Sequence, residues 1–313
     1  MWAAPIVFGS GSFTADNEKA AFRQLDLFVE LGGNLIDTAN IYGQSPSCDQ
    51  NLSEQIIGRW FQERNQPADI FISTKGGHPR LESMNIPRLD EDSLSKDLET
   101  SRQTLGRDCL DLYFLHRDDP SQPVEVLLSQ LEAFRQAGLI KYYGLSNWKA
   151  ERLQKAIDWC RKLDSCGLVA VQNRWSLAQY NPSGSSDLTT AAVDEQIWQL
   201  LNKNNLTVLA YGAMAKGFFN KISAADAGSL PDKLRRYYLN DVSMKRAEVL
   251  KSISIARNIP PAQIALAWLL NQPFPVFPIV SFSAHAQLEE AMGAPAIFLN
   301  DDELALLSAG SLT

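Results

Sequence analysis

Short apolar runs alternate with longer amphipathic stretches along the whole chain. The apolar runs are rich in Val, Ile, Leu and Phe, which is typical of strands that are buried on both faces. The amphipathic stretches carry apolar residues at helical spacing, as between Glu18 and Leu31, and several end at a glycine. The predicted strands are Ile6–Phe8, Leu35–Ile36, Ile70–Lys75, Leu110–His116, Lys141–Asn147, Leu168–Asn173, Thr207–Gly212 and Val276–Val280.

Helices are predicted between these strands. Asp16 or Asn17 is expected to cap the first helix, and Ser53 the second. The charged segment 216–244 shows no clear period and is expected to be irregular. The predicted helices cover residues 18–31, 53–64, 91–105, 123–137, 151–163, 190–202, 245–257 and 261–270, and a closing helix starts at 287.

The alternation of eight strands with helices predicts the fold class. Strands that alternate with helices form parallel sheets, and the units recur roughly every 30–40 residues, the length of a βα unit. Eight such units in 313 residues predict a closed (β/α)8 TIM barrel. No linker divides the chain, so residues 1–313 are expected to form a single domain. A dinucleotide-binding Rossmann start at Gly9-Ser10-Gly11 is disfavoured, because Thr14 stands where the third glycine would be.

Composition and charge narrow the function classes. Hydrophobic residues make up 45% of the chain and charged residues 21%, as in ordinary globular proteins. The net charge is −7 and the cations are scattered, which argues against nucleic acid and weakly against anionic membranes. No apolar window long enough for a membrane span and no export signal are seen. The cysteines show no paired spacing, so free thiols in the cytoplasm are expected, and the oligomeric state is open; the cysteines are Cys48, Cys109, Cys160 and Cys166.

Polar side chains end most of the predicted strands. In a (β/α)8 barrel the C-terminal strand ends meet at one rim, where active sites lie. Taken singly, each side chain also fits a structural role, such as a loop cap, a solvated lysine or a satisfied core histidine. Their gathering at one rim favours a reaction site. The strand-end residues are Asp37, Lys75, His116, Ser146, Asn147, Gln172 and Tyr211, and Tyr42 follows in the loop after Asp37.

Tyr42, Lys75 and Asp37 suggest an acid catalyst. A phenol with a pKa of about 10 is a poor acid near neutrality, and a buried ammonium beside it favours the phenolate and lowers that pKa. Asp37 can hold Lys75 in place and charged, and His116 can orient a carbonyl oxygen or relay a proton. An acid of this kind delivers a proton to an oxygen whose carbon receives a hydride. The protein has no hydride of its own, so a nicotinamide cofactor is implied.

These residues, in this order, resemble the catalytic tetrad of the aldo-keto reductases. The flanking segments 36–43, 73–75, 111–116 and 144–148 are similar too, and the likeness runs through all eight units. The resemblance implies that Tyr42 is the proton donor, that Lys75 and Asp37 tune it, and that His116 positions the carbonyl. His116 favours carbonyl or alcohol chemistry, since relatives that reduce carbon–carbon double bonds carry glutamate there. By the same resemblance Ser146, Asn147 and Gln172 hold the nicotinamide carboxamide, and Tyr211 stacks on the nicotinamide ring.

The chain departs from the family pattern at its ends. Only Met1 to Pro5 precede the first strand, so the hairpin that usually plugs the barrel bottom is expected to be short or absent. The C-terminal tail after the closing helix is also expected to be short, which leaves an open substrate pocket. That pocket is expected to border on His78, Trp148, Trp175 and the segment 216–244, although His78 and Trp175 fit packing roles equally well.

The cofactor's adenosine end shows the larger departure. Gly212 replaces the serine that usually contacts the pyrophosphate, and Lys216 is the expected substitute. Where relatives bind the 2′-phosphate of NADP with cations, this chain offers Ser281, Ser283 and Gln287. Glu290 matches a family residue near the adenine. NADP(H) is therefore expected from family habit, with NAD(H) as the alternative.

Two function classes fit the sequence. The first is an enzyme that reduces a small-molecule aldehyde or ketone to an alcohol, or runs the reverse reaction. The second is a regulatory or scaffold protein of the same fold that binds cofactor with little turnover; the intact tetrad favours the enzyme. The natural substrate stays open, with a mild preference for small, polar carbonyl compounds.

Overall fold

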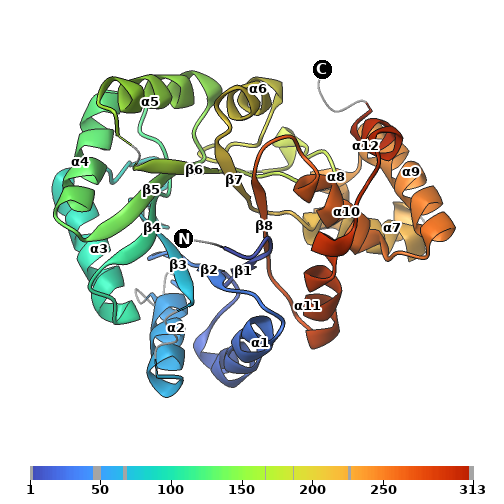
Figure 1. Ribbon diagram of the computed structural model, residues 1–313, viewed down its shortest axis with the longest axis horizontal. Helices are drawn as coiled ribbons and strands as arrows, with labels where there is room; N and C mark the ends of the chain where they lie inside the picture. The colour runs from blue at the N-terminus through green and yellow to red at the C-terminus, as the bar shows by residue number, and fades with distance from the viewer. Residues whose placement is uncertain are drawn as a thin grey trace. The chain divides into compact units, whose positions relative to one another are not determined.

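A computed structural model describes residues 3–44, 51–65, 69–165, 167–185, 187–224 and 227–309. Its eight strands form one closed parallel barrel in which they follow one another in sequence order (Figure 1). This confirms the (β/α)8 fold predicted from the alternation of apolar and amphipathic segments. The strands are β1 (Val7–Gly9), β2 (Leu35–Asp37), β3 (Phe71–Gly76), β4 (Leu110–Leu115), β5 (Ile140–Ser146), β6 (Leu168–Gln172), β7 (Thr207–Ala210) and β8 (Val276–Val280).

Helices follow the strands, and most lie within a few residues of the predicted ranges. Short 3-10 turns accompany them at Ala15–Asn17, Pro182–Gly184, Ala215–Gly217, Ala227–Ser229 and Ala294–Ala296. The α-helices are α1 (Glu18–Glu30), α2 (Leu52–Glu63), α3 (Glu91–Leu105), α4 (Val124–Gln136), α5 (Ala150–Lys162), α6 (Glu195–Asn204), α7 (Phe218–Ala224), α8 (Asp232–Tyr238), α9 (Asp241–Arg257), α10 (Pro261–Leu270), α11 (His285–Met292) and α12 (Asp301–Ser308).

The chain divides into two compact units, Met1–Gln172 and Asn173–Thr313. The first unit holds β1 to β6 and α1 to α5, and the second holds β7, β8 and α6 to α12. That residues 1–313 form one domain stays a prediction.

The core of the first unit lies on both sides of its strands. Every residue of β4 is buried, as expected for a parallel strand that is covered on both faces. Outside the strands, Trp60 of α2 and Phe28 of α1 are also buried. Gly58 lets α2 approach α3 closely, because a Cβ there would collide with the carbonyl oxygen of Thr104. The strand ends are therefore held by a close-packed shell of helices.

The second unit is built around α10, whose residues are almost all apolar and buried. An aromatic cluster lies beside it. Trp175 stacks on Phe274 with ring centroids 5.9 Å apart, and its edge meets Trp268 at 5.6 Å. This cluster fixes the segment that follows β6.

The segment 216–244 is where the predicted secondary structure is wrong. It holds α7, α8 and the start of α9, because Phe218, Leu234 and Tyr238 are buried and anchor these short helices. Asn240 caps α9 by accepting a hydrogen bond from the backbone N–H of Ser243. The charged residues between these anchors conceal their spacing.

Three further expectations also need correction. Helix α6 begins at Glu195 and not at 190, since Asp194 caps it. Ser53 does not cap α2; its hydroxyl lies 2.7 Å from the Ser10 hydroxyl. Helix α12 is absent from the sequence-based prediction, although Asn300 and Glu303 form a capping box at its start.

Other sequence expectations concern the chain ends and the thiols. Residues 3–6 contain no strand, so no hairpin precedes β1 in that stretch. Cys109 and Cys160 are free thiols, whereas Cys48 and Cys166 lie outside the described residues. None of the helices in the described ranges has the length and apolar character of a membrane span.

Candidate active site

The ends of β2 and β3 bring Asp37 and Lys75 together. Lys75 is fully buried, and its Nζ lies 2.7 Å from Oδ2 of Asp37 and 2.6 Å from the carbonyl oxygen of Thr38. Oδ1 of Asp37 accepts hydrogen bonds from Ser73 Oγ at 2.9 Å and from Gln172 Nε2 at 2.8 Å. Both carboxylate oxygens are thus satisfied, as a buried charge requires.

Lys75 stays charged in this setting. Burial pushes its pKa down, but the Asp37 carboxylate and the Tyr42 phenol oppose burial, and the pKa is raised above its ordinary value. The geometry therefore fits the expected buried ammonium beside a phenol.

Tyr42 lies in the loop after β2, directly beside Lys75. The Lys75 Nζ is 4.9 Å from the centroid of the Tyr42 ring, and the His116 ring meets it edge-on at 5.7 Å. The loop is fixed at the tyrosine, because the backbone N–H of Ser53 donates to the Tyr42 carbonyl oxygen at 3.2 Å. Gly43 follows with φ +86°, where a Cβ would lie 2.7 Å from Cβ of Leu52, so glycine suits this turn.

His116 directly follows β4, and its ring is buried and neutral. Burial, followed by the nearby charge of Arg117, holds its pKa well below the usual value. Nδ1 of His116 is buried and has no hydrogen-bond partner within the described part of the chain. The His78 ring lies 4.7 Å away, and Nδ1 of His78 is 2.6 Å from the carbonyl oxygen of Pro79.

Ser146, Asn147 and Gln172 lie side by side at the ends of β5 and β6. Ser146 pairs with Gln172 in register, and its Oγ donates to the Gln172 carbonyl oxygen at 2.8 Å. Nδ2 of Asn147 donates to the His116 carbonyl oxygen at 3.1 Å. Trp148 is fully buried, with the Arg152 guanidinium 4.9 Å from its ring. The first unit thus gathers Asp37, Tyr42, Lys75, His78, His116, Ser146, Asn147 and Gln172.

The second unit holds Tyr211, Gly212 and Lys216, and beside them an arginine that sequence reasoning missed. Arg174 lies 5.0 Å from the Tyr211 ring centroid, and its side chain comes within 3.8 Å of the place where a Cβ of Gly212 would be. Burial lowers the Arg174 pKa, but the phenols of Tyr211, Tyr238 and Tyr180 outweigh it and raise the pKa. A guanidinium therefore borders Gly212.

Lys216 and Glu290 both have shifted pKa values. Lys216 has φ +56°, and burial followed by the charge of Lys233 lowers its pKa. Burial raises the Glu290 pKa, and a hydrogen bond from Asn220 opposes that rise. Glu290 thus connects α11 to α7.

The neutral residues expected at the 2′-phosphate lie around the start of α11. Oε1 of Gln287 accepts hydrogen bonds from the Ser283 backbone N–H and hydroxyl, each at 3.1 Å. Ser281 directly follows β8.

Comparison with known proteins identifies the family. The model of the aldo/keto reductase family matches residues 5–310. The chain belongs to the aldo/keto reductase family.

Individual relatives are distant but cover most of the chain. The aldo-keto reductase yakc [NADP(+)] of Schizosaccharomyces pombe is 28% identical over 91% of this chain and 80% of its own length. Aldo-keto reductase str7 of Strobilurus tenacellus is also 28% identical, over 94% of this chain and 81% of its own length. The solved structure of the thermostable aldo-keto reductase Tm1743 in complex with the inhibitor epalrestat aligns with a TM-score of 0.72 at 24% identity. It covers 98% of this chain and 94% of that one.

Helix α2 of this aldo/keto reductase contributes a buried acid that sequence reasoning also missed. Glu54 accepts hydrogen bonds from Thr74 Oγ1 at 2.5 Å and from Asn51 Nδ2 at 2.7 Å. Burial raises its pKa above the ordinary value. Ser53 and Glu54 thus tie the first turn of α2 to β3 and to the Tyr42 loop. The polar Asn51–Glu54 pair at a helix start was the available signal.

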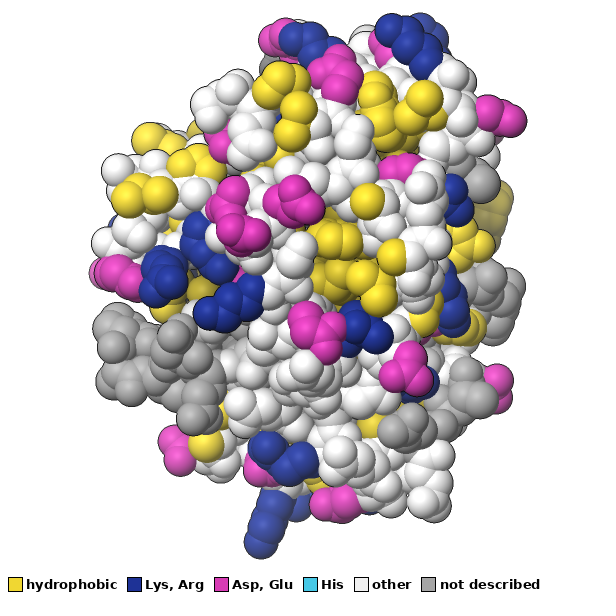
Figure 2. Space-filling model, turned by 90° about the vertical axis from the view of Figure 1, so that its left-hand side faces the viewer, with side chains coloured by type: hydrophobic (Ala, Val, Ile, Leu, Met, Phe, Trp, Pro, Cys, Tyr) yellow, Lys and Arg dark blue, Asp and Glu magenta, His cyan; other side chains and the backbone are white. Residues whose placement is uncertain are grey.

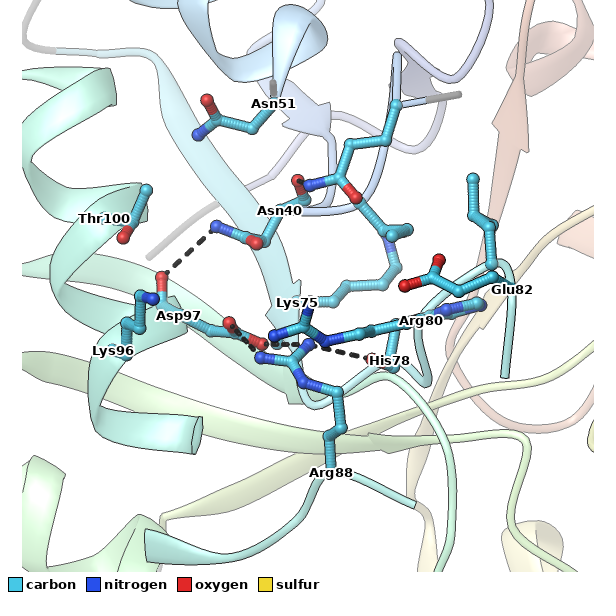
Figure 3. A pocket seen from close by; sticks show the side chains of 14 residues that line it. Asn40, Asn51, Lys75, His78, Arg80, Glu82, Arg88, Lys96, Asp97 and Thr100 are labelled. Carbon is cyan, nitrogen blue, oxygen red and sulfur yellow. Dashed lines mark hydrogen bonds and ion pairs between the residues drawn. The ribbon is translucent and has the colours of Figure 1, made fainter. Parts of the chain in front are cut away.

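A cavity of about 430 Å³ opens beside Lys75 and His78 (Figure 3). Loops after β2 and β3 and one face of α3 line it, and its walls are mainly polar. Neither Tyr42 nor His116 contributes to the lining. The cavity therefore adjoins the tetrad of Asp37, Tyr42, Lys75 and His116 from the side of the lysine.

Proposed function

We propose that this family member is an NADP-dependent oxidoreductase that reduces an aldehyde or ketone to an alcohol, or runs the reverse reaction. The supporting observation is the buried pair of Lys75 and Asp37, whose ammonium lies 4.9 Å from the Tyr42 ring. A bound nicotinamide supplies the hydride.

Each tetrad residue has a distinct part in the proposed reaction. Tyr42 donates the proton to the carbonyl oxygen, and Lys75 stabilises the phenolate that remains. Asp37 keeps Lys75 charged and fixed. The low pKa of His116 keeps its ring neutral, so the ring can orient the carbonyl oxygen by a hydrogen bond without adding charge.

The cofactor contacts are proposed residue by residue. Ser146, Asn147 and Gln172 would bind the nicotinamide carboxamide, and Tyr211 would stack on the ring. Gly212, Lys216 and Arg174 would lie along the pyrophosphate. The preference for NADP over NAD is supported by the name of the Schizosaccharomyces pombe relative, aldo-keto reductase yakc [NADP(+)]. Ser281, Ser283 and Gln287 would then meet the 2′-phosphate with neutral donors, near Glu290 at the adenine. The substrate contacts proposed from the sequence are His78, Trp148 and Trp175.

Replacing Tyr42 tests the reaction. The purified protein should oxidise NADPH in the presence of a panel of small aldehydes, and Tyr42→Phe should lower kcat by about 10²- to 10⁴-fold, since proton delivery is lost. Tyr142→Phe on β5 is the matched control and should leave turnover unchanged. Turnover that survives Tyr42→Phe would contradict the mechanism. Cofactor binding without any turnover would instead support the regulatory or scaffold class.

A further inference from the structure

The cavity beside Lys75 carries more positive than negative side chains. The cations are Arg80, Arg88 and Lys96, with Lys75 in the wall, and the acids are Glu82 and Asp97. This local excess occurs in a chain whose net charge is −7. The remaining polar lining consists of the His78 imidazole, three amides and a hydroxyl, the last four from Asn40, Gln44, Asn51 and Thr100.

Among the described residues, the acids of the cavity pair with one of its cations, Arg88. Asp97 is already engaged: its carboxylate accepts from Nη2 of Arg88 at 2.9 Å and from the backbone N–H of Gly77 at 2.9 Å. Arg80 and Lys96 form no ion pair with any residue in the described ranges. Figure 3 shows the Arg80 side chain extending from its loop across the cavity toward Arg88. Arg88 is thus paired with Asp97 on α3, whereas Arg80 has no such partner in the described ranges.

We propose that this cavity binds the carboxylate or phosphate group of a small organic anion, with Arg80 and Lys96 as its direct contacts. Guanidinium and ammonium groups form charge-assisted hydrogen bonds with such oxyanions, and these are the stronger hydrogen bonds in proteins. The volume of about 430 Å³ suits a small metabolite. Arg88 also borders the cavity, and its ion pair with Asp97 holds its guanidinium in place.

The anion has two possible sources. It is either the charged end of the carbonyl substrate or a separate effector that binds beside the reacting molecule. The first source rests on the proposed reductase function, because it needs a carbonyl at Tyr42. The second does not. Lys75 and His78 border both the cavity and the tetrad, so either anion lies close to the proposed site of proton transfer.

Direct binding tests the site without any turnover. Titration calorimetry with inorganic phosphate and with succinate should show saturable binding that weakens as salt rises. The double substitution Arg80→Gln and Lys96→Gln should weaken this binding at least tenfold. Lys19→Gln with Arg23→Gln, which removes two exposed cations from α1, is the matched control and should bind as the original protein does. Failure of both anions to bind, or equal binding by the double variant, would overturn the proposal.

Matched aldehydes distinguish the two sources. If the anion is part of the substrate, kcat/KM for succinic semialdehyde should exceed that for butanal. The ratio of the two should fall at least tenfold in the double variant, mainly through KM. If the anion is an effector, succinate should bind and alter butanal turnover without competing with it. Anion binding in a protein that turns over neither aldehyde would support the cavity proposal and count against the proposed function instead.

Discussion

The pair of Lys75 and Asp37 is stable only as a pair. Both side chains are buried, and Nζ of Lys75 lies 2.7 Å from Oδ2 of Asp37. Removing one partner leaves an uncompensated buried charge, which is far more damaging than loss of the attraction alone.

Asp37→Asn should therefore destabilise the fold. We expect a loss of about 3–5 kcal/mol in the free energy of unfolding, measured by urea denaturation, because Lys75 is then buried without a counter-charge. Ser73→Ala removes one neutral donor to the same carboxylate and should lower stability by only about 1 kcal/mol. Equal effects of the two substitutions would show that the ion pair is not the dominant contact.

His116 should make stability depend on acidity. Its pKa is lowered in the folded state, so below about pH 6.5 the unfolded chain binds a proton that the folded chain does not. The contribution of His116 to the free energy of unfolding is then fully present above about pH 6.5. It decreases as the pH drops, by at most about 1.4 kcal/mol per pH unit. Urea midpoints measured across that range should flatten in His116→Gln. An unchanged slope would contradict this origin.

Glu54 should act in the opposite direction. Its pKa is raised by burial, so the folded chain keeps a proton that the unfolded chain loses above about pH 4.5. Its contribution is complete below that pH and is lost as the pH rises through the folded-state pKa. Glu54→Gln mimics the protonated acid and should remove this loss of stability at higher pH. Glu54→Asp keeps a titratable acid on a shorter side chain and should retain the loss. Denaturation curves measured from about pH 4.5 upward provide the measurement.

At the scale of elements, the strands were predictable because their apolar runs are visible in the sequence itself. A parallel strand that is buried on both faces is a continuous apolar run, and β8 matches its predicted range residue for residue. The short helices α7 and α8 were not predictable, since among the described residues each has only two buried anchors. Their helical state depends on tertiary packing, which a local pattern does not contain.

Helix α12 offers a test of local capping. Asn300 accepts from the backbone N–H of Glu303 at 2.9 Å, and the Glu303 side chain accepts from the Asn300 N–H at 3.0 Å. Asn300→Ala should lower stability by about 0.5–2 kcal/mol, and Asn300→Asp should restore it. Thermal unfolding monitored by circular dichroism measures both.

The predictability of the site follows a similar division. Asp37, Lys75 and His116 were visible because a polar residue that ends an apolar strand is rare and local. Arg174 and Glu54 were not, because their meaning depends on partners distant in sequence: Tyr211 for the arginine and Thr74 for the acid.

At the scale of the whole molecule, one face shows charges of both signs. On the face on the side of α3, α4 and α5, Lys and Arg lie among Asp and Glu with hydrophobic side chains between them (Figure 2). A nucleic-acid-binding protein would concentrate its cations in one patch or stripe. On this face, a few Lys and Arg side chains gather at the left of the view in Figure 2, with acidic side chains close by.

Cofactor preference should appear in the stability of the whole protein. A ligand at 100 times its Kd adds about 2.7 kcal/mol to folding stability. NADPH should therefore raise Tm more than NADH at equal concentration if the 2′-phosphate is bound. Ser283→Ala should reduce that difference, and Ser252→Ala on α9 should not. An equal rise in Tm with both cofactors would indicate that the protein binds NAD(H) as well as NADP(H).

The hydrogen bond from Gln172 to Asp37 joins residues that are 135 positions apart. During synthesis, β2 and β3 emerge early, so Lys75 can meet Asp37 well before the ribosome reaches β6. Oδ1 of Asp37 acquires its last donor only when residue 172 has been added and has left the exit tunnel. Contacts of such separation form late, after the loop between them has been closed. A nascent chain halted before that point carries the whole tetrad, but its Asp37 lacks one of the hydrogen-bond donors that hold the carboxylate.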